Sequence, residues 1–247
     1  LRELVEQRTV ELQSVNAQLN EANQKLKQLS NKDELSGLRN RHFVYEQLPK
    51  DIEHYQRNRE SMISQGKSFA LVLINIDGFK HVNDGHGPIA GDSVLTQFAV
   101  LLTRETRGSD YVVRWGGDEF MIVLRDTQAN QIESFIYELN LAVANGEFYL
   151  PDGQDVNVTC SIGYAFYPLP LIGGQLINWE VSLSLADMAL HQVQNAGRNG
   201  WATVEFDDQV DAFEFEDNEA LETSLEQLFA TGAARFNVRL ADTGFSG

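Results

Sequence analysis

Apolar residues recur every seven positions near the start of the chain. They form two interleaved series: Val5, Leu12, Leu19 and Leu26, and then Val15, Ala22 and Leu29. A heptad repeat of this length predicts a two-stranded coiled coil over residues 1–30, with Arg8 as its one charged interruption. A single amphipathic helix lying on its own domain is the alternative. The Glu, Gln, Asn and Lys residues between the apolar positions favour the coiled coil.

Two β-type patterns follow. Residues 69–76 begin with a continuous apolar run, which is typical of a strand buried on both faces. Residues 111–113 and 120–124 are apolar runs on either side of Gly116-Gly117. Glycine tolerates the positive φ angles of tight turns, so this arrangement predicts a β-hairpin.

Helical spacing of apolar residues accounts for most of the remaining chain. It predicts helices over 41–58 (apart from Pro49), from 78 onward, and over 92–106, 128–144 and 179–195. Residues 156–166 alternate as a strand. The resulting order, β-α-β-β-α-β, predicts a split βαβ fold of the α+β class: a central antiparallel sheet with flanking helices.

Composition narrows the functional classes. The net charge of −17 argues against long nucleic acid as a partner. Cys160 is the single cysteine, which excludes an internal disulfide and suits the cytoplasm. We see no apolar stretch long enough for a membrane span, and no signal peptide. The chain begins with Leu, so we expect a fragment whose upstream sensor or membrane anchor is not in view.

The hairpin carries two adjacent carboxylates, Asp118 and Glu119. As neighbours on an emerging strand they should point to opposite faces, so one can meet a cation while the other joins the scaffold. Gly116 and Gly117 would let a bulky ligand approach the backbone. An ordinary acidic hairpin is the alternative interpretation.

The tip of the buried strand adds further polar groups. Asn75 and Asp77 share one face of that tip, and Lys80 follows one turn later. Oxygen ligands beside a carboxylate hairpin suit a hard divalent cation with nucleotide phosphates, and Lys80 would add a positive charge for phosphate.

These segments resemble, in order, the motifs of the GGDEF domain, the catalytic domain of bacterial diguanylate cyclases. The matching segments are residues 33–41, 76–84, 91–92, 114–120, 186–190 and 196–200. The resemblance implies a GGDEF domain over 31–205 with the nucleotide-cyclase palm fold. It leaves residues 1–30 as a signalling helix and 206–247 as an acidic extension without an assigned role.

The resemblance also implies a reaction and its ligands. Two GTP molecules would condense into cyclic di-GMP in a symmetric homodimer and release two pyrophosphates, with two Mg²⁺ or Mn²⁺ ions in each active site. The substrate contacts it implies are Phe79, Lys80, Asn83, Asp92, Gly116, Gly117 and Arg198. Among these, Asn83 and Asp92 would read guanine, and Phe79, Lys80 and Arg198 would hold phosphate.

Metal and catalytic groups are implied in the same way. Asn75, the backbone carbonyl of Ile76 and Asp118 match the metal-binding positions. Asp118, Glu119 and Lys80 match the catalytic ones. Asn83 and Asp92 in isolation would be interpreted as turn and helix-cap residues.

Three residues depart from the family pattern. Asn75 stands where the family has a metal-binding Asp, Pro88 replaces a His, and Gln194 replaces a phosphate-binding Lys. Loss of a charged ligand lowers metal affinity. These departures favour the second hypothesis: a degenerate module that binds GTP or cyclic di-GMP and regulates without catalysis.

A further match concerns regulation. Arg107 and Asp110 have the spacing of the family's inhibitory RxxD site, which binds the product. A solvated turn at a helix end is the alternative. The resemblance therefore implies cyclic di-GMP both as product and as inhibitor.

Overall fold

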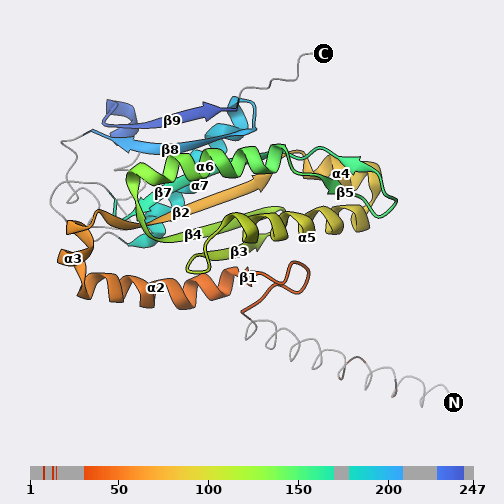
Figure 1. Ribbon diagram of the computed structural model, residues 1–247, viewed down its shortest axis with the longest axis horizontal. Helices are drawn as coiled ribbons and strands as arrows, with labels where there is room; N and C mark the ends of the chain where they lie inside the picture. The colour runs from red at the N-terminus through yellow and green to blue at the C-terminus, as the bar shows by residue number, and fades with distance from the viewer. Residues whose placement is uncertain are drawn as a thin grey trace.

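The computed structural model describes residues 31–169, 178–207 and 227–241, together with the single helical positions Arg8, Gln13 and Val15. Figure 1 shows the arrangement of these segments. The predicted coiled coil over 1–30 therefore lies almost entirely outside the described residues. Within them, no helix combines the length and the apolarity that crossing a bilayer requires.

Strands and helices are interspersed along the described chain, with several strands following one another directly, as in an α+β protein. The strands are β1 (Arg39–Asn40), β2 (Lys67–Ile76), β3 (Tyr111–Gly116), β4 (Glu119–Gln128), β5 (Phe148–Tyr149), β6 (Asp155–Val156), β7 (Cys160–Tyr167), β8 (Gly200–Phe206) and β9 (Ala234–Leu240). The helices are α2 (Arg41–Arg57), α3 (Arg59–Ser64), α4 (Phe79–His86), α5 (Pro88–Glu105), α6 (Ala129–Ala144) and α7 (Trp179–Ala196).

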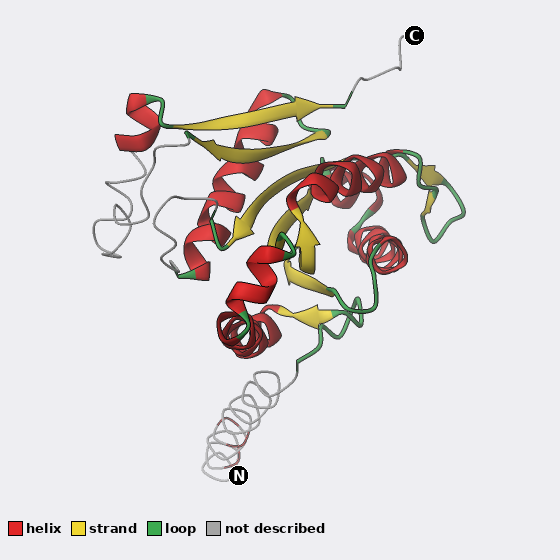
Figure 2. Cartoon of the chain, turned by 60° about the vertical axis from the view of Figure 1, so that its left-hand side comes forward, coloured by secondary structure: helices red, strands yellow, loops and turns green. Residues whose placement is uncertain are grey.

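One seven-stranded sheet organises the fold, in the order β1-β3-β4-β2-β7-β8-β9. Its pairs are antiparallel except β1 with β3 and β7 with β8. Figure 2 shows the helices lying on both sides of this twisted sheet. The predicted α+β palm architecture is confirmed.

Helices cover both faces of β2, which explains its continuous apolar run. Its even-numbered residues pack with α5 and α6: Ala70, Val72, Ile74 and Ile76. Its odd-numbered residues pack with α2 and α7: Phe69, Leu71 and Leu73. A strand with two buried faces needs apolar side chains at every position. Asn75 is the next odd-numbered residue, and it is polar and only half-buried. The apolar core on the α2 and α7 side of β2 therefore does not extend to this position.

Two helices differ from the sequence prediction. Helix α5 begins at Pro88 rather than at 92. Proline has no N–H to donate, and the first helical position needs none, so Pro88 is compatible with the helix start. Pro49 lies inside α2 rather than interrupting it.

The predicted strand over 156–166 is wrong at its start. Residues 155–156 instead pair with Phe148–Tyr149 as a separate two-stranded sheet, and β7 begins at Cys160. Ser93 and Gln97 of α5 bind the Tyr149 carbonyl at 3.0 and 2.7 Å. Contacts with a helix distant in sequence thus select the short hairpin.

Part of the predicted C-terminal extension joins the main sheet. Strand β9 pairs antiparallel with β8 along its whole length. Upstream of it, residues 227–231 are helical. Residues 234–240 thus form a strand docked on the main sheet, within the extension to which the sequence assigned no role.

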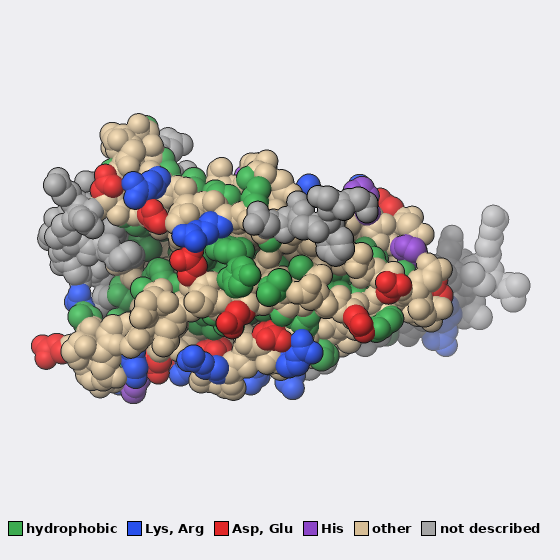
Figure 3. Space-filling model, turned by 45° about the horizontal axis from the view of Figure 1, so that its top comes forward, with side chains coloured by type: hydrophobic (Ala, Val, Ile, Leu, Met, Phe, Trp, Pro, Cys, Tyr) green, Lys and Arg blue, Asp and Glu red, His purple; other side chains and the backbone are tan. Residues whose placement is uncertain are grey.

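Surface charge is mixed despite the net charge of −17. On the face shown in Figure 3, Lys and Arg side chains are interspersed with carboxylates. Local cations therefore remain available to an anionic ligand, because nearby charges dominate the potential at a site.

Candidate functional site

The hairpin and the tip of β2 are joined through their backbones. Asn75 and Glu119 are direct partners in the β2–β4 register. The Ile76 amide donates to the Asp118 carbonyl at 3.2 Å. The structure thus brings together the predicted metal positions Asn75, Ile76 and Asp118, with Glu119 beside them.

Asp118 and Glu119 occupy different parts of the hairpin. Asp118 lies in the turn with Gly117, and Glu119 is the first residue of β4. The expectation that both sit on a strand is therefore wrong for Asp118. Cross-strand partners point to the same face, so Glu119 rather than Asp118 shares a face with Asn75.

Arg114 fastens the turn. Its Nε and Nη2 donate to the Gly117 carbonyl at 3.1 and 2.8 Å, and its Nη1 donates to Asp33 Oδ1 at 3.1 Å. Asp33 also accepts from the Ser36 amide and hydroxyl at 2.8 and 2.7 Å. The loop at 33–38, whose motif resembles the family, is thereby held against the hairpin.

The glycine pair leaves space over the turn. A Cβ added at Gly116 or Gly117 would meet no atom within 4 Å, and Gly117 has a φ of +55°. The turn therefore requires glycine for its backbone conformation, and it presents open backbone to a ligand.

Asp77 serves the scaffold rather than a ligand. Its carboxylate accepts from Thr159 Oγ1 at 2.8 Å, from Ser161 Oγ at 2.7 Å and from the Asn199 amide at 3.0 Å. With three donors on its two oxygens, Asp77 ties the strand tip to β7 and to the loop after α7. The expectation that it contributes a free oxygen ligand is wrong, and its partners are too distant in sequence to have been foreseen.

The predicted guanine contacts come together on α4 and α5. A Cβ at Gly91 would overlap the Asn83 amide and approach Phe79 Cζ to 3.0 Å. Gly91 therefore allows α5 to pack closely against Asn83 and Phe79. Asp92 follows on α5, exposed, and it lines a cavity of about 610 Å³ together with Leu35.

The predicted phosphate contacts are exposed cations on separate elements. Lys80 lies in the first turn of α4, and Arg198 lies in the loop between α7 and β8. Neither forms an ion pair with another described residue. Both remain available to an anion.

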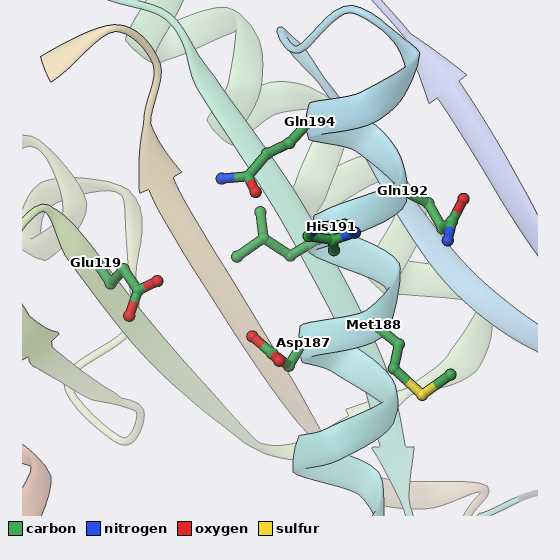
Figure 4. Close-up of a pocket in the computed structure, with 7 residues that line it drawn as sticks. Glu119, Asp187, Met188, His191, Gln192 and Gln194 are labelled. Atoms are coloured by element: carbon green, nitrogen blue, oxygen red, sulfur yellow. The ribbon is translucent and has the colours of Figure 1, made fainter. Parts of the chain in front are cut away.

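Helix α7 places Asp187 and His191, two residues without a predicted role, beside Gln194 and Glu119. Asp187, His191 and Gln194 line a cavity of about 500 Å³ with Glu119. In Figure 4, Asp187 and Gln194 extend from the side of α7 that faces Glu119, whereas Met188 and Gln192 point away. Asp187 lies in segment 186–190, which resembles a family motif, and this resemblance could have identified it as a site residue from the sequence.

Burial raises the pKa of Glu119, and the charges of Asp118 and Asp187 raise it further, while Arg41 lowers it. Carboxylates crowded together in this way repel one another when all are ionised. The chemistry of the donor set, carboxylate, amide and carbonyl oxygens, fits a hard divalent cation, which would relieve the repulsion. Within the described ranges, no group of three or more His, Cys, Asp or Glu side chains meets the requirements of a metal site. Asn75, the partner of Glu119 across the two strands, supplies an amide rather than a carboxylate.

We expect Glu119→Gln to raise the melting temperature in EDTA at pH 7 by a small amount, on the order of 1 °C. The raised pKa of Glu119 means that ionisation destabilises the folded state as pH rises above the ordinary value of 4.5. The gain should therefore shrink at pH 4 and be reversed by Mg²⁺, as followed by thermal melts. A variant less stable than the parent in EDTA at pH 7 would contradict this electrostatic interpretation.

The predicted inhibitory residues lie together at the start of β3. Asp110 accepts from the Arg107 amide at 3.3 Å and from the Arg125 amide at 3.1 Å. Arg125 Nη1 donates to the Ser109 carbonyl at 3.2 Å. Arg107, Asp110 and Arg125 line a small cavity of about 60 Å³. Arg125 is a second arginine at this place, and its proximity follows from the β3–β4 pairing.

Known proteins have sequences similar to this chain. The family "Diguanylate cyclase, GGDEF domain" matches residues 30–200. Diguanylate cyclase DgcP of Pseudomonas aeruginosa is 31% identical over 68% of the chain. Cyclic di-GMP phosphodiesterase NbdA of the same species is 34% identical over 78%. The chain spans 23% of the length of each of these relatives.

A solved structure gives the same result. Diguanylate cyclase SiaD of Pseudomonas aeruginosa, in complex with its activator SiaC, superposes with a TM-score of 0.59 at 28% sequence identity. The alignment covers 80% of this chain and 72% of that one.

Proposed function

Because this chain belongs to the GGDEF domain family, we propose that it is a diguanylate cyclase, a nucleotidyltransferase that joins two GTP molecules into cyclic di-GMP and releases two pyrophosphates. One observation carries the proposal. The residues that carry the hairpin carboxylates lie in a fixed register with the tip of β2. Asn75 is opposite Glu119, and the Ile76 amide donates a hydrogen bond to the Asp118 backbone carbonyl.

We assign Asp118, Glu119, Asn75 and the Ile76 carbonyl to binding Mg²⁺ or Mn²⁺. The metal would supply Lewis-acid stabilisation of the phosphates and lower the pKa of the attacking hydroxyl. Arg114 holds the turn that carries Asp118. Asp77 holds the strand tip that carries Asn75, so the oxygens are positioned before a ligand arrives.

We assign the remaining residues to GTP. Asn83 and Asp92 would recognise the guanine edge, because an amide and a carboxylate complement its donors and acceptors. Lys80 and Arg198, both exposed and without ion pairs in the described chain, would hold the phosphates, with Phe79 beside them. Gly116 and Gly117 would give the nucleotide access to the backbone of the turn.

The product is two-fold symmetric, so two domains must face each other during synthesis. Each 3′-hydroxyl attacks the α-phosphate of the opposite GTP. We propose a homodimer held through residues 1–30, whose heptads would keep two sites at high effective concentration. An upstream sensor would act through that helix. We place the domain in the cytoplasm, where GTP is available.

A specific observation favours a second candidate. Asn75 contributes an amide rather than a carboxylate to the tip, and Gln194 contributes no positive charge to the cavity beside Glu119. A domain that binds GTP or cyclic di-GMP and regulates a neighbouring domain would tolerate both.

Direct assay separates the two candidates. The dimer is incubated with GTP and either Mg²⁺ or Mn²⁺, and nucleotides are resolved by chromatography. Cyclic di-GMP and pyrophosphate in a 1:2 ratio would support the cyclase. Nucleotide binding without product would support the regulatory domain.

We expect Arg107→Ala to weaken product inhibition strongly. Arg107 lines the small cavity with Asp110 and Arg125, and arginine recognises guanine and phosphate edges with paired donors. Loss of one such contact should weaken cyclic di-GMP binding about 10- to 100-fold without changing the initial rate. Initial rates titrated with cyclic di-GMP measure this. Unchanged inhibition in the variant would refute the assignment, and Arg104→Ala, on the exposed end of α5, is the matched control.

A further inference from the structure

The loop that carries Arg198 has an unusual backbone. Gly197, Arg198 and Asn199 all have positive φ angles, of 129°, 67° and 47°. Residues other than glycine rarely adopt positive φ angles because of steric clashes with Cβ. Arg198 and Asn199 therefore adopt them only because surrounding contacts impose this conformation. The direction of the Arg198 side chain therefore depends on those contacts.

On its inner side the loop is held by elements of the GGDEF domain. The Arg198 amide donates to the Val193 carbonyl at 2.9 Å, and the Asn199 amide donates to Asp77 Oδ2 at 3.0 Å. Asp77 directly follows Ile76 at the end of β2. The Arg198 loop is therefore hydrogen-bonded to the residue next to the candidate metal positions.

On its outer side the loop is held by the end of β9. The Ala241 amide donates to the Asn199 carbonyl at 2.8 Å. Gly200 pairs with Leu240, and a Cβ at Gly200 would overlap the Arg239 carbonyl and lie 2.8 Å from Leu240 Cα. Leu240 also reaches within 3.8 Å of the position of a Gly197 Cβ. The backbone of β9 thus packs against Gly200, and the Leu240 side chain approaches Gly197 at the other end of the loop.

Side chains anchor β9 in this place. Glu205 on β8 accepts from Arg235 Nε at 3.1 Å and from Asn237 Nδ2 at 2.7 Å. Arg239 forms an ion pair with Glu133 of α6 at 2.8 Å. The strand is therefore registered against β8 by its own contacts, and it presents Leu240 and Ala241 to the loop as a consequence.

Strand β9 lies beyond residues 30–200, the part of the chain that the family matches. We propose that β9 is a positioning element for nucleotide binding: through Leu240 and Ala241 it holds the Arg198 loop in the conformation that receives the GTP phosphates. This inference rests on the proposed function. It makes the segment after the GGDEF domain a route by which events downstream alter GTP affinity.

Ala241→Pro tests the hydrogen bond. Proline removes the amide that donates to Asn199, and the residue before it, Leu240, is already extended. We expect the dissociation constant of 3′-deoxy-GTP, which cannot cyclise, to rise about three- to tenfold with Mg²⁺ present. Leu240→Ala should produce a similar rise by loosening the packing at Gly197 and Gly200.

Val238→Ala is the matched control. Val238 and Leu240 lie two residues apart on β9, with exposed fractions of 36% and 46%. Val238 pairs with Ala202, away from the loop. Its truncation should leave the 3′-deoxy-GTP dissociation constant unchanged. Combining Ala241→Pro with Arg198→Ala should weaken binding no further than Arg198→Ala alone, because the strand acts through that arginine.

A readout without nucleotide separates this inference from the proposed function. Hydrogen exchange of the Asn199 amide should accelerate in Ala241→Pro, because its bond to Asp77 opens more often, and stay unchanged in Val238→Ala. Unchanged exchange and unchanged affinity in Ala241→Pro would overturn the positioning role. Accelerated exchange in a chain that binds no GTP would instead retain the mechanical coupling and reject the proposed function.

Discussion

Asp118→Ala is expected to reduce cyclic di-GMP synthesis by about 10³-fold or more. Asp118 occupies the turn of the hairpin, where its backbone carbonyl accepts from the Ile76 amide and its side chain is the carboxylate proposed to hold the cation. Removing it should leave the turn intact, because Arg114 binds the neighbouring Gly117 carbonyl. The loss should therefore appear in turnover and in Mg²⁺ dependence rather than in folding.

The measurement is product formation under saturating GTP, with thermal melts as a check on folding. Glu53→Ala, an exposed carboxylate on α2, is the control and should behave as the parent. Full synthesis by Asp118→Ala would reject the assignment of the hairpin to catalysis.

Asn75→Asp is expected to raise turnover at limiting Mg²⁺ about 10-fold or more. The register places residue 75 directly opposite Glu119, so a carboxylate there would complete an acidic set that now contains an amide. The same change should lower the melting temperature in EDTA, because another negative charge joins a group in which the pKa of Glu119 is already raised. Mg²⁺ should then stabilise the variant more than the parent.

Asn75→Ala separates charge from packing. It removes the amide oxygen without adding a carboxylate, so it should lower turnover and leave the EDTA melt nearly unchanged. If the parent makes no product and Asn75→Asp restores synthesis, the natural domain is the regulatory module. If Asn75→Asp gains neither activity nor Mg²⁺-dependent stability, residue 75 does not contribute to a metal site.

Local sequence patterns were sufficient to predict those elements whose structure depends on their own residues. The buried strand was foreseen because both faces of β2 require apolar residues, and the hairpin because Gly117 adopts a positive φ. The strand expected over 156–166 failed because Ser93 and Gln97 of α5 bind the Tyr149 backbone and favour a separate hairpin there. No periodicity within that segment reports such a contact.

The same division applies to the candidate site. Motif order predicted Asn75, Asp118 and Asn83 as site residues, because family motifs preserve chemistry at fixed intervals. Asp77 was misjudged, since its donors Thr159, Ser161 and Asn199 come from segments more than 80 residues away. Asp187 was not selected, because only the packing of α7 on the sheet brings it near Glu119.

The sequence by itself determined the family, the α+β class and the chemical groups available for GTP and metal, because these depend on residue types at set spacings. Tertiary structure alone decided which oxygens are free and which are engaged, and it placed β9 against the Arg198 loop. The physical reason is that hydrogen bonds and ion pairs form between groups close in space, and chain spacing does not report that proximity once the backbone has folded into a sheet.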